Sequence, residues 1–216
     1  MFLDFNDPLD RTIILHKEYE RHQFDFLIKE IQKNNSKIFL DIGANSGYYS
    51  FFVALEFPQI KIRAFEPNKI AFLKYQKTLN KNKFLKKQIK LYKFGASHKS
   101  GKLKMGGLIK DNYLQPGGSA ILNKRMMKNP NIRTLYGNFK KIDEIFKIKK
   151  ESLAIKIDVE GNENLTLNGM KNLLKKNNII LQIEIFNENF TTINKKLLKL
   201  GFKKINKINH DYFYRN

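Results

Sequence analysis

A short stretch with two glycines lies where an apolar run gives way to a second one. Residues 39–47 read FLDIGANSG and contain the pattern D-x-G-x-x-x-G, from Asp41 through Gly43 to Gly47. In an open parallel sheet, ligands bind beyond the carboxyl ends of the strands, and a glycine turn there lets a ligand lie against backbone amides. The G-x-G-x-x-G pattern of dinucleotide enzymes instead seats a pyrophosphate on a helix N-terminus. The missing glycine therefore argues against a bound pyrophosphate and disfavours a nicotinamide oxidoreductase.

An acidic residue closes the next apolar run. Glu66 ends the sequence IKIRAFE and is followed by Pro67 and Asn68. A carboxylate at the end of the second strand can accept hydrogen bonds from both hydroxyls of a ribose. The glycine turn and this acid, on consecutive strands and at the same end of a sheet, fit a nucleoside without a phosphate. S-adenosylmethionine is such a ligand, and together the two motifs predict that it binds here.

The elements that must position these motifs follow from an alternation along the chain. Runs that are apolar nearly throughout and alternate with helices are typical of a parallel sheet covered on both faces. We expect strands at 37–43, 60–67, 89–97, 152–161 and 178–186, with two terminal strands at 202–208 and 211–216. Helical spacing of apolar residues predicts helices at 17–32, 47–57, 68–82, 165–174 and 190–200.

The alternation breaks between residues 98 and 140. This segment is rich in glycine and shows no sustained helical period. In a compact domain, so long an irregular segment is usually functional. We expect a lid or substrate-loop insertion, within one domain that spans residues 1–216 and begins with a helical segment at 1–36. Tyr113 and Leu114 could cover a substrate there, and closure would exclude water.

Composition limits the choice of partner and compartment. The formal net charge of +21 attracts phosphate, yet only six of the 41 basic residues are arginine, whose fork suits phosphate and base contacts. The lysines are scattered, so we expect a solvated lysine surface, with nucleic acid a disfavoured partner. The chain has no cysteine, and we see no signal peptide or membrane-spanning run, which together indicate a cytoplasmic protein.

Several sequence blocks resemble the FkbM family of methyltransferases in their order and approximate spacing. They are FLDIGANSGYYS, AFEPN, GAS....G, GGSAIL, KKIDEIF, IKIDVEGNE and LQIEIF, and the resemblance covers about residues 17–214. The most specific are D-x-G-A-N-x-G-Y-Y and I-K-I-D-V-E-G-x-E. Lys140 and Lys141 precede Ile142 and Asp143 where the family more often has Thr-Leu-Asp. The resemblance implies the α/β class I methyltransferase fold (Rossmann-like, doubly wound). Its mostly parallel seven-stranded sheet has one antiparallel strand near the edge, supplied by one of the two C-terminal segments.

The resemblance also implies which residues hold S-adenosylmethionine. Its methionine part would be surrounded by residues of the glycine turn: Asp41, Gly43, Ala44, Asn45 and Gly47. Its ribose and adenine would contact residues after the next two strands: Glu66, Pro67, Asn68, Gly95 and Ala96. Among these, Glu66 would hold the ribose, and Gly95 and Ala96 would flank the adenine. Family members commonly O-methylate sugars or natural products, so the implied acceptor is a hydroxyl of a sugar, a polysaccharide precursor or another small natural product.

Three carboxylates fall beside the expected transfer point. Methyl transfer to an alcohol needs the acceptor oxygen, the methyl carbon and the sulfur in line, and a base for the proton. Asp158 and Glu160 share one face of their strand end, and Glu184 is an acid inside an apolar run, which is costly to bury without a partner or a function. We expect these three to form an acidic floor that orients the hydroxyl, with one of them as base. Alternatively, Glu160 caps the next helix and Glu184 pairs with a lysine such as Lys156.

Other possibilities stay open. The three carboxylates could gather Mg²⁺, but their spacing is no recognised metal signature, so we expect no metal. His98 and His210 are alternative bases, although lone histidines near loops are more often surface residues. An RNA or protein methyltransferase would use the same cofactor site, with the lysine surface as a docking face. A non-catalytic module would bind S-adenosylmethionine without turnover.

Overall fold

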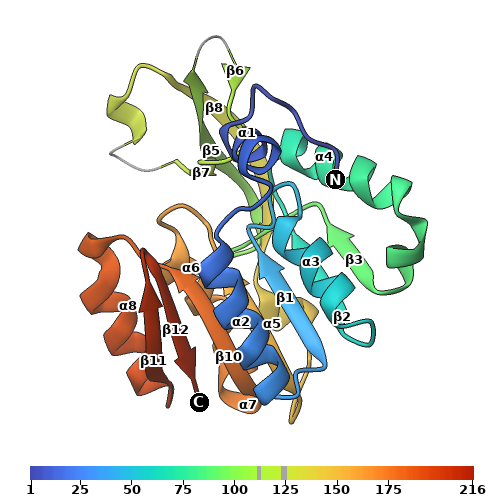
Figure 1. Ribbon diagram of the computed structural model, residues 1–216. Coiled ribbons are helices and arrows are strands. Elements are labelled where there is room, and N and C mark those ends of the chain that lie inside the picture. The colour runs from blue at the N-terminus through green and yellow to red at the C-terminus, as the bar shows by residue number, and fades with distance from the viewer. Residues whose placement is uncertain (111–112, 123–125) are drawn as a thin grey trace.

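The computed structural model of the chain describes residues 1–110, 113–122 and 126–216. Within those ranges, a seven-stranded sheet with the order β11-β12-β10-β9-β1-β2-β3 forms the main layer (Figure 1). Its strands are β1 (Ile38–Ile42), β2 (Lys61–Phe65), β3 (Ile89–Tyr92), β9 (Ser152–Ile157), β10 (Asn178–Glu184), β11 (Lys203–Ile208) and β12 (Asp211–Arg215). Neighbours from β3 to β10 run parallel, whereas β12 is antiparallel to both β10 and β11. The expected sheet with one reversed strand near its edge is confirmed.

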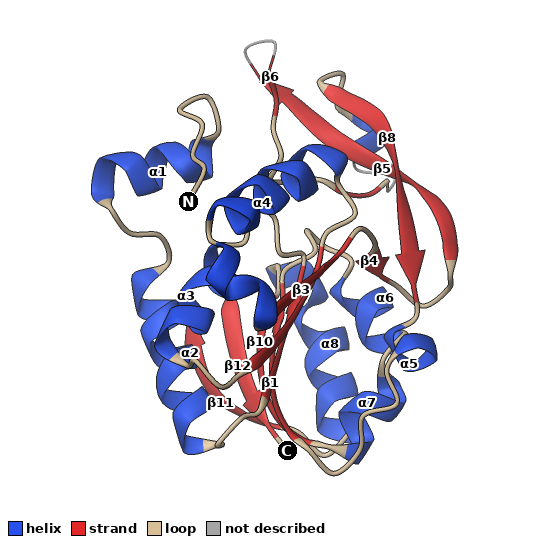
Figure 2. Cartoon of the chain, turned by 90° about the vertical axis from the view of Figure 1, so that its right-hand side faces the viewer, coloured by secondary structure: helices blue, strands red, loops and turns tan. Residues whose placement is uncertain are grey.

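Helices cover both faces of this sheet (Figure 2). The longer helices are α1 (Pro8–His16), α2 (Arg21–Lys33), α3 (Tyr48–Glu56), α4 (Lys69–Lys81) and α8 (Asn187–Lys199). The shorter ones are α5 (Ile142–Ile145), α6 (Glu163–Asn168), α7 (Lys171–Lys176) and the 3₁₀ turns η1 (Lys83–Lys87) and η2 (Met126–Lys128). No helix in the described ranges has both the length and the apolarity needed to cross a bilayer.

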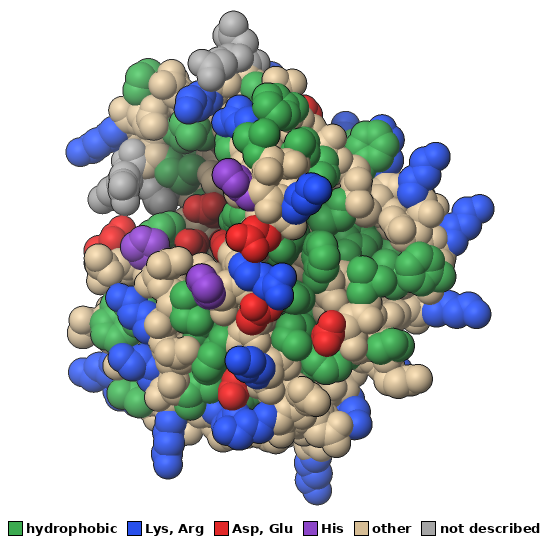
Figure 3. All heavy atoms as spheres, viewed as in Figure 1, with side chains coloured by type: hydrophobic (Ala, Val, Ile, Leu, Met, Phe, Trp, Pro, Cys, Tyr) green, Lys and Arg blue, Asp and Glu red, His purple; other side chains and the backbone are tan. Residues whose placement is uncertain are grey.

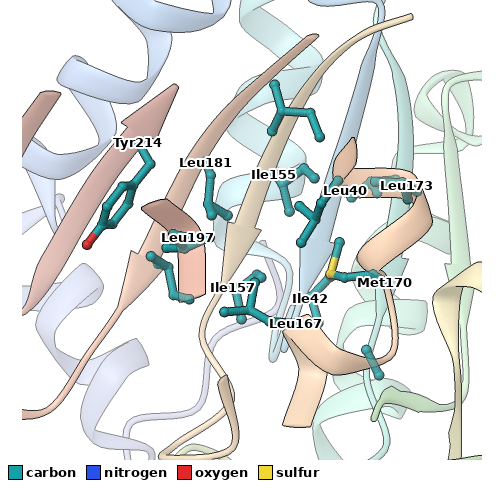
Figure 4. Close-up of a cluster of buried hydrophobic side chains, with 14 of the residues drawn as sticks. Leu40, Ile42, Ile155, Ile157, Leu167, Met170, Leu173, Leu181, Leu197 and Tyr214 are labelled. Carbon is teal, nitrogen blue, oxygen red and sulfur yellow. The ribbon is translucent and has the colours of Figure 1, made fainter. Parts of the chain in front are cut away.

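Two hydrophobic cores follow from the alternation of side chains along each strand. On one face, Phe39 of β1 packs with Leu27 of α2 and Val53 of α3. On the other, the next residue, Leu40, joins a cluster with side chains of α6, α7 and α8, among them Leu197 (Figure 4). Because every strand in the centre of the sheet is buried on both faces, each reads as a nearly continuous apolar run.

The helix expected at 165–174 is divided in two at Gly169. A Cβ added at this glycine would lie 2.0 Å from the carbonyl oxygen of Ser97, so the chain approaches the neighbouring backbone more closely than any side chain allows. The strand expected at 89–97 is also divided. It leaves the main sheet after Tyr92, and Gly95–Ala96 becomes a strand of a second sheet.

The expectation of an irregular segment between residues 98 and 140 is wrong for the part that the structure describes. This part forms a small sheet of the strands β4 (Gly95–Ala96), β5 (Gly101–Lys110), β6 (Tyr113–Leu114), β7 (Ala120–Ile121) and β8 (Ile132–Lys140). Strands β5 and β8 pair antiparallel over most of their length. The small sheet lies over the carboxyl ends of the main strands (Figure 1). Residues 111–112 and 123–125 of the segment lie outside the described residues.

Glycines explain why the small sheet left no strand pattern. A Cβ at Gly106 would lie 2.6 Å from Met126 Cε, and one at Gly137 would lie 2.5 Å from Met105 Sδ. Both glycines lie inside paired strands. The positions that pack most tightly therefore carry no side chain, and the alternation of apolar and polar residues on which strand prediction depends is lost.

The N-terminal helix α1 packs against α4 and the small sheet rather than against the main sheet. Lys74 of α4 forms ion pairs with Asp7, at 2.8 Å, and with Asp10. The hydroxyl of Tyr113 in β6 donates to Asp4 Oδ2 at 3.0 Å. These contacts place α1 near the carboxyl ends of the strands, beside the residues singled out as a binding site.

Candidate active site

The glycine turn after β1 is fixed by close contacts that only glycine permits. Gly43 has φ +84°, and a Cβ there would lie 1.7 Å from the carbonyl oxygen of Asp158. Gly47 has φ +90°, and its Cβ would lie 2.7 Å from the ring of Phe51 and 2.8 Å from that of Tyr75. A positive φ costs an L-residue about 1–2 kcal/mol, and here the space is also taken. The turn is therefore held against the end of β9 on one side and the α3–α4 packing on the other.

Two buried carboxylates support this turn. Asp41 accepts a hydrogen bond of 2.6 Å from Ser50 Oγ, and burial raises its pKa. Glu66 accepts the backbone N–H of Asn45 at 2.8 Å through one oxygen and that of Asn68 at 2.7 Å through the other. Burial raises the pKa of Glu66 to about 7, although the two N–H donors act in the opposite direction. Glu66 thus links the loops after β1 and β2, and each of its oxygens keeps a second lone pair.

A cavity of about 470 Å³ opens above the turn, a size within the range of small-molecule sites. Its lining includes most of the residues expected from the sequence: Asp41, Gly43, Ala44, Asn45, Glu66, Pro67, Gly95, Ala96, Asp158 and Glu160. Gly47, Asn68 and Glu184 do not line it. Gly47 lies behind the turn as the N-cap of α3, and Asn68 supports Glu66 and caps α4 through a bond to the N–H of Ile70.

Sequence reasoning missed part of the cavity wall. Asp7, Pro8, Leu9 and Thr12, in and just before α1, line it, as do residues 115–121 of the small sheet. The sequence QPGG marked a turn, and Asp7-Pro8 marked a helix start, but neither pattern indicates what the element covers. Both walls depend on contacts between residues far apart in the chain.

Three polar side-chain atoms in the cavity wall have no hydrogen-bond partner among the described residues. They are Asn45 Oδ1, Ser46 Oγ and Gln115 Oε1. Buried polar groups in proteins are nearly always paired, because an unpaired one loses its bonds to water without replacement. The three atoms are themselves covered by neighbouring protein atoms, so in this arrangement of the wall they do not face the open cavity.

A buried lysine organises the cavity wall at the end of β9. Lys156 Nζ donates to Asp158 Oδ2 at 2.7 Å and lies 4.5 Å from the ring centre of Tyr49. The Tyr49 hydroxyl donates to Glu20 at 2.8 Å and accepts from Gln182 Nε2 at 3.0 Å. Burial disfavours the charge on Lys156, but the surrounding carboxylates, Asp158 first, outweigh it and hold the lysine pKa above its ordinary value. The lysine thus stays charged and fixes one oxygen of Asp158.

Glu160 holds a strained backbone position and reaches across the cavity. Its φ is +54°, in the left-handed region that residues other than glycine seldom adopt. Its carboxylate accepts the backbone N–H of Gly118 at 3.1 Å. Glu160 does not cap α6: the N-cap position is Asn162, which makes no side-chain cap bond, and Glu163 accepts the N–H of Gly161 at 2.8 Å. Burial, with Asp158 nearby, raises the pKa of Glu160 to about 7. Such strain is found mostly at functional sites.

Glu184 ends β10, on the same face of the sheet as Lys156. Burial and the charges of Asp158 and Glu160 raise its pKa well above the ordinary value. No described residue hydrogen-bonds its carboxylate, and Lys156 bonds Asp158 rather than Glu184. Acidic side chains gather in the hollow between the small sheet and the main body, while lysines project around the outside (Figure 3). Within the described ranges, no group of three or more histidine, cysteine or acidic residues is arranged to hold a metal ion.

The sequence comparison decides the family. Residues 41–204, most of the chain, match the Methyltransferase FkbM domain. The chain belongs to the FkbM methyltransferase family. It is an S-adenosylmethionine-dependent methyltransferase, which confirms both the resemblance and the expected cofactor. No protein of curated function matches the sequence.

Solved structures share the fold of this FkbM methyltransferase at low identity. Methyltransferase FkbM from Methylobacillus flagellatus KT superposes with a TM-score of 0.56 and 15% identity, covering 84% of this chain and 44% of that one. A "putative caffeoyl-CoA O-methyltransferase" from Staphylococcus aureus superposes with a TM-score of 0.55 and 13% identity, covering 96% of this chain and 89% of that one. The chain therefore spans less than half the length of the Methylobacillus protein. The likeness shows a shared class I methyltransferase fold.

A loop of the small sheet bridges the mouth of the FkbM methyltransferase's cavity. We call residues 115–119, which read QPGGS, the strap. At one end, Asn68 Nδ2 donates to Ser119 Oγ at 2.9 Å. Near the middle, the Gly118 N–H bonds Glu160. The strap therefore joins the loop beside Glu66 to the acidic wall, and a molecule in the cavity would lie beneath it.

Proposed function

We propose that this FkbM methyltransferase is an O-methyltransferase whose acceptor is a hydroxyl of a sugar, a polysaccharide precursor or another small natural product. The observation that carries the proposal is a shared cavity. Asp158 and Glu160, which follow the neighbouring strand β9, line the same hollow as the glycine turn and Glu66. A carboxylate so placed can take a proton from an alcohol held beside the cofactor.

In this proposal the cofactor lies along the turn from Asp41 to Gly47. The glycine turn faces its methionine part, Glu66 accepts bonds from its ribose hydroxyls, and Gly95 and Ala96 flank its adenine. The free oxygen lone pairs of Glu66 support the assignment. S-adenosylmethionine, when bound, supplies an electrophilic methyl group on a sulfonium. The protein then has to align the acceptor and remove its proton.

Asp158 is the proposed base, with Lys156 as the residue that positions it. Lys156 engages Oδ2 of Asp158, and no described residue bonds the other oxygen, Oδ1. That oxygen is the one we assign to the acceptor hydroxyl. Glu160 completes the acidic floor, and its pKa, which burial raises to about 7, suits proton transfer near neutral pH. Glu184 does not line the cavity, and its raised pKa favours the protonated form at neutral pH.

The test is the variant Asp158→Asn. Loss of a general base should lower turnover about 10²–10⁴-fold. Affinity for S-adenosylhomocysteine should stay within about tenfold, because the carboxamide keeps the shape of the side chain. Turnover would be followed as S-adenosylhomocysteine formation with a panel of glycosides, and Asp25→Asn, on the exposed face of α2, serves as the matched control. Normal turnover in Asp158→Asn would remove this residue as the base.

A second candidate is an RNA or protein methyltransferase, and the charge distribution supports it. No acidic residue occurs from Pro67 to Lys110, a stretch that includes α4, η1 and β3. Lysines therefore dominate one side of the molecule, opposite in sign to the acidic wall. This reading predicts RNA binding that weakens steeply with salt. Salt-independent or undetectable RNA binding, together with turnover of a sugar, would leave the first candidate.

A further inference from the structure

A second hollow, of about 680 Å³, lies beside the cofactor cavity. We call it the side groove. One wall comes from Phe186–Asn189, at the start of α8, with His210 of the β11–β12 turn. The other comes from Met126, Lys128, Asn129 and Ile132. The groove and the cofactor cavity share Gly118, Ala120 and Glu160. A molecule in the groove would therefore reach the cofactor cavity at Glu160.

The side chains of the groove suit an uncharged, hydrogen-bonding ligand. Phe186 is half-buried, with its ring centre 6.1 Å from that of His210, so one ring face can support a flat apolar surface. Asn187 and Asn189 carry side-chain amides that no described residue engages. Each amide offers both a donor and an acceptor, which matches neighbouring hydroxyls on a sugar ring.

The charges of the groove oppose an anionic ligand. Among the described residues that line the groove, Lys128 is the one lysine, and Glu160 lies at the opening to the cofactor cavity. Burial and then the charges of Asp158 and Glu160 raise the pKa of Glu184, so these two carboxylates make the potential near the end of β10 negative. The positive end of the α8 dipole is matched by Glu188 in its first turn. No arginine occurs among the described lining residues, and a phosphate in the groove would lie near the Glu160 carboxylate.

We propose that the side groove is the acceptor subsite and that it takes an uncharged polyhydroxylated group, such as a sugar ring without phosphate. The ring lies on Phe186, the amides of Asn187 and Asn189 bond its hydroxyls, and one hydroxyl reaches Glu160 at the opening to the cofactor cavity. This inference rests on the proposed O-methyltransferase function and adds where the acceptor binds and which acceptors are rejected.

The experiment uses binding, so it does not depend on turnover. Saturation-transfer NMR would be recorded on the protein with S-adenosylhomocysteine bound, against a panel of methyl glycosides and the corresponding sugar phosphates. The chain has no cysteine, so Asn189→Cys, coupled to a bulky maleimide, blocks the groove at one chosen point. Asn80→Cys, exposed on α4 and labelled in the same way, is the matched control.

We expect transfer from at least one methyl glycoside and none from its phosphate. Phe186→Ala should weaken that binding about tenfold, and the label at position 189 should abolish it, while the label at position 80 should leave it unchanged. Calorimetry should show unchanged S-adenosylhomocysteine affinity in all variants. Binding that survives the block at 189, stronger binding of sugar phosphates, or no transfer from any neutral glycoside would overturn the inference. Failure of the unsubstituted protein to bind S-adenosylhomocysteine would instead refute the proposed function.

Discussion

The substitution Gly43→Ala tests the tightest contact in the site, and Gly201→Ala is its matched control. Both glycines have nearly the same backbone conformation, φ +84° and φ +89°. A Cβ at Gly201 would meet nothing within 4 Å, whereas one at Gly43 would lie 1.7 Å from the Asp158 carbonyl oxygen. The pair therefore separates the cost of backbone strain from the cost of the clash.

The expected magnitudes follow from that difference. Strain alone should cost about 1–2 kcal/mol in Gly201→Ala. Ordinary contact begins near 3.4 Å, so in Gly43→Ala the ends of β1 and β9 must part by roughly 3.4 − 1.7 = 1.7 Å. Overpacking of this kind adds about 1–3 kcal/mol or more. Because Asp158 moves with the strand end, S-adenosylhomocysteine affinity should fall at least about tenfold in Gly43→Ala alone.

Urea denaturation gives the two stability changes, and calorimetric titration gives the two affinities. Equal destabilisation by the two substitutions, with S-adenosylhomocysteine affinity in Gly43→Ala within about twofold of the parent, would refute the reasoning. The turn would then be able to move away from Asp158 without loss, and its glycine would serve only the positive φ.

Three further predictions concern charge and the strap. Because burial raises the pKa of Glu66 from 4.5 to about 7, the folded state holds this proton more tightly than the unfolded chain does. Its contribution to stability is full below about pH 4.5 and is lost as the pH rises to about 7. The denaturation midpoint of the cofactor-free protein should therefore fall over that pH range, and it should fall less in Glu66→Gln. An equal fall in the parent protein and in Glu66→Gln would contradict the raised pKa of Glu66. Lys156→Met should destabilise the protein by about 3–5 kcal/mol in urea denaturation, because it leaves Asp158 without its buried partner; a change below about 0.5 kcal/mol would show that the pair contributes little. S-adenosylhomocysteine should protect residues 115–119 from proteolysis, and unchanged cleavage would argue against a lid.

The main sheet and the cofactor turn could be predicted because their signals are local. Strands such as β1 and β9 are buried on both faces and read as apolar runs, and the helices between them keep a 3.6-residue period. The glycine turn and Glu66 could be placed together because parallel strands bring their carboxyl ends to one edge. The predicted positions of Asp41, Glu66 and Asp158 in one cavity needed no long-range information beyond strand order.

The small sheet, the position of α1 and the partner of Lys156 depend on contacts between distant residues, which no local sequence pattern predicts. The small sheet was missed because Gly106 and Gly137 lie where its packing is tightest, so its strands lack the usual alternation. The cover formed by α1 depends on Lys74 reaching Asp7 across 67 positions of sequence. The sequence also could not predict which carboxylate Lys156 bonds. Its bond to Asp158 rather than to Glu184 follows from side-chain geometry at the strand end.

The most direct test of the account is calorimetric titration of the protein with S-adenosylhomocysteine, repeated with Glu66→Ala. The control is Glu56→Ala, at the exposed end of α3. The account predicts micromolar binding to the parent protein and to Glu56→Ala, and binding at least about tenfold weaker in Glu66→Ala, because the acceptor for the ribose hydroxyls is removed. Equal affinity in Glu66→Ala and the parent, or no binding to either, would contradict the cofactor site described here.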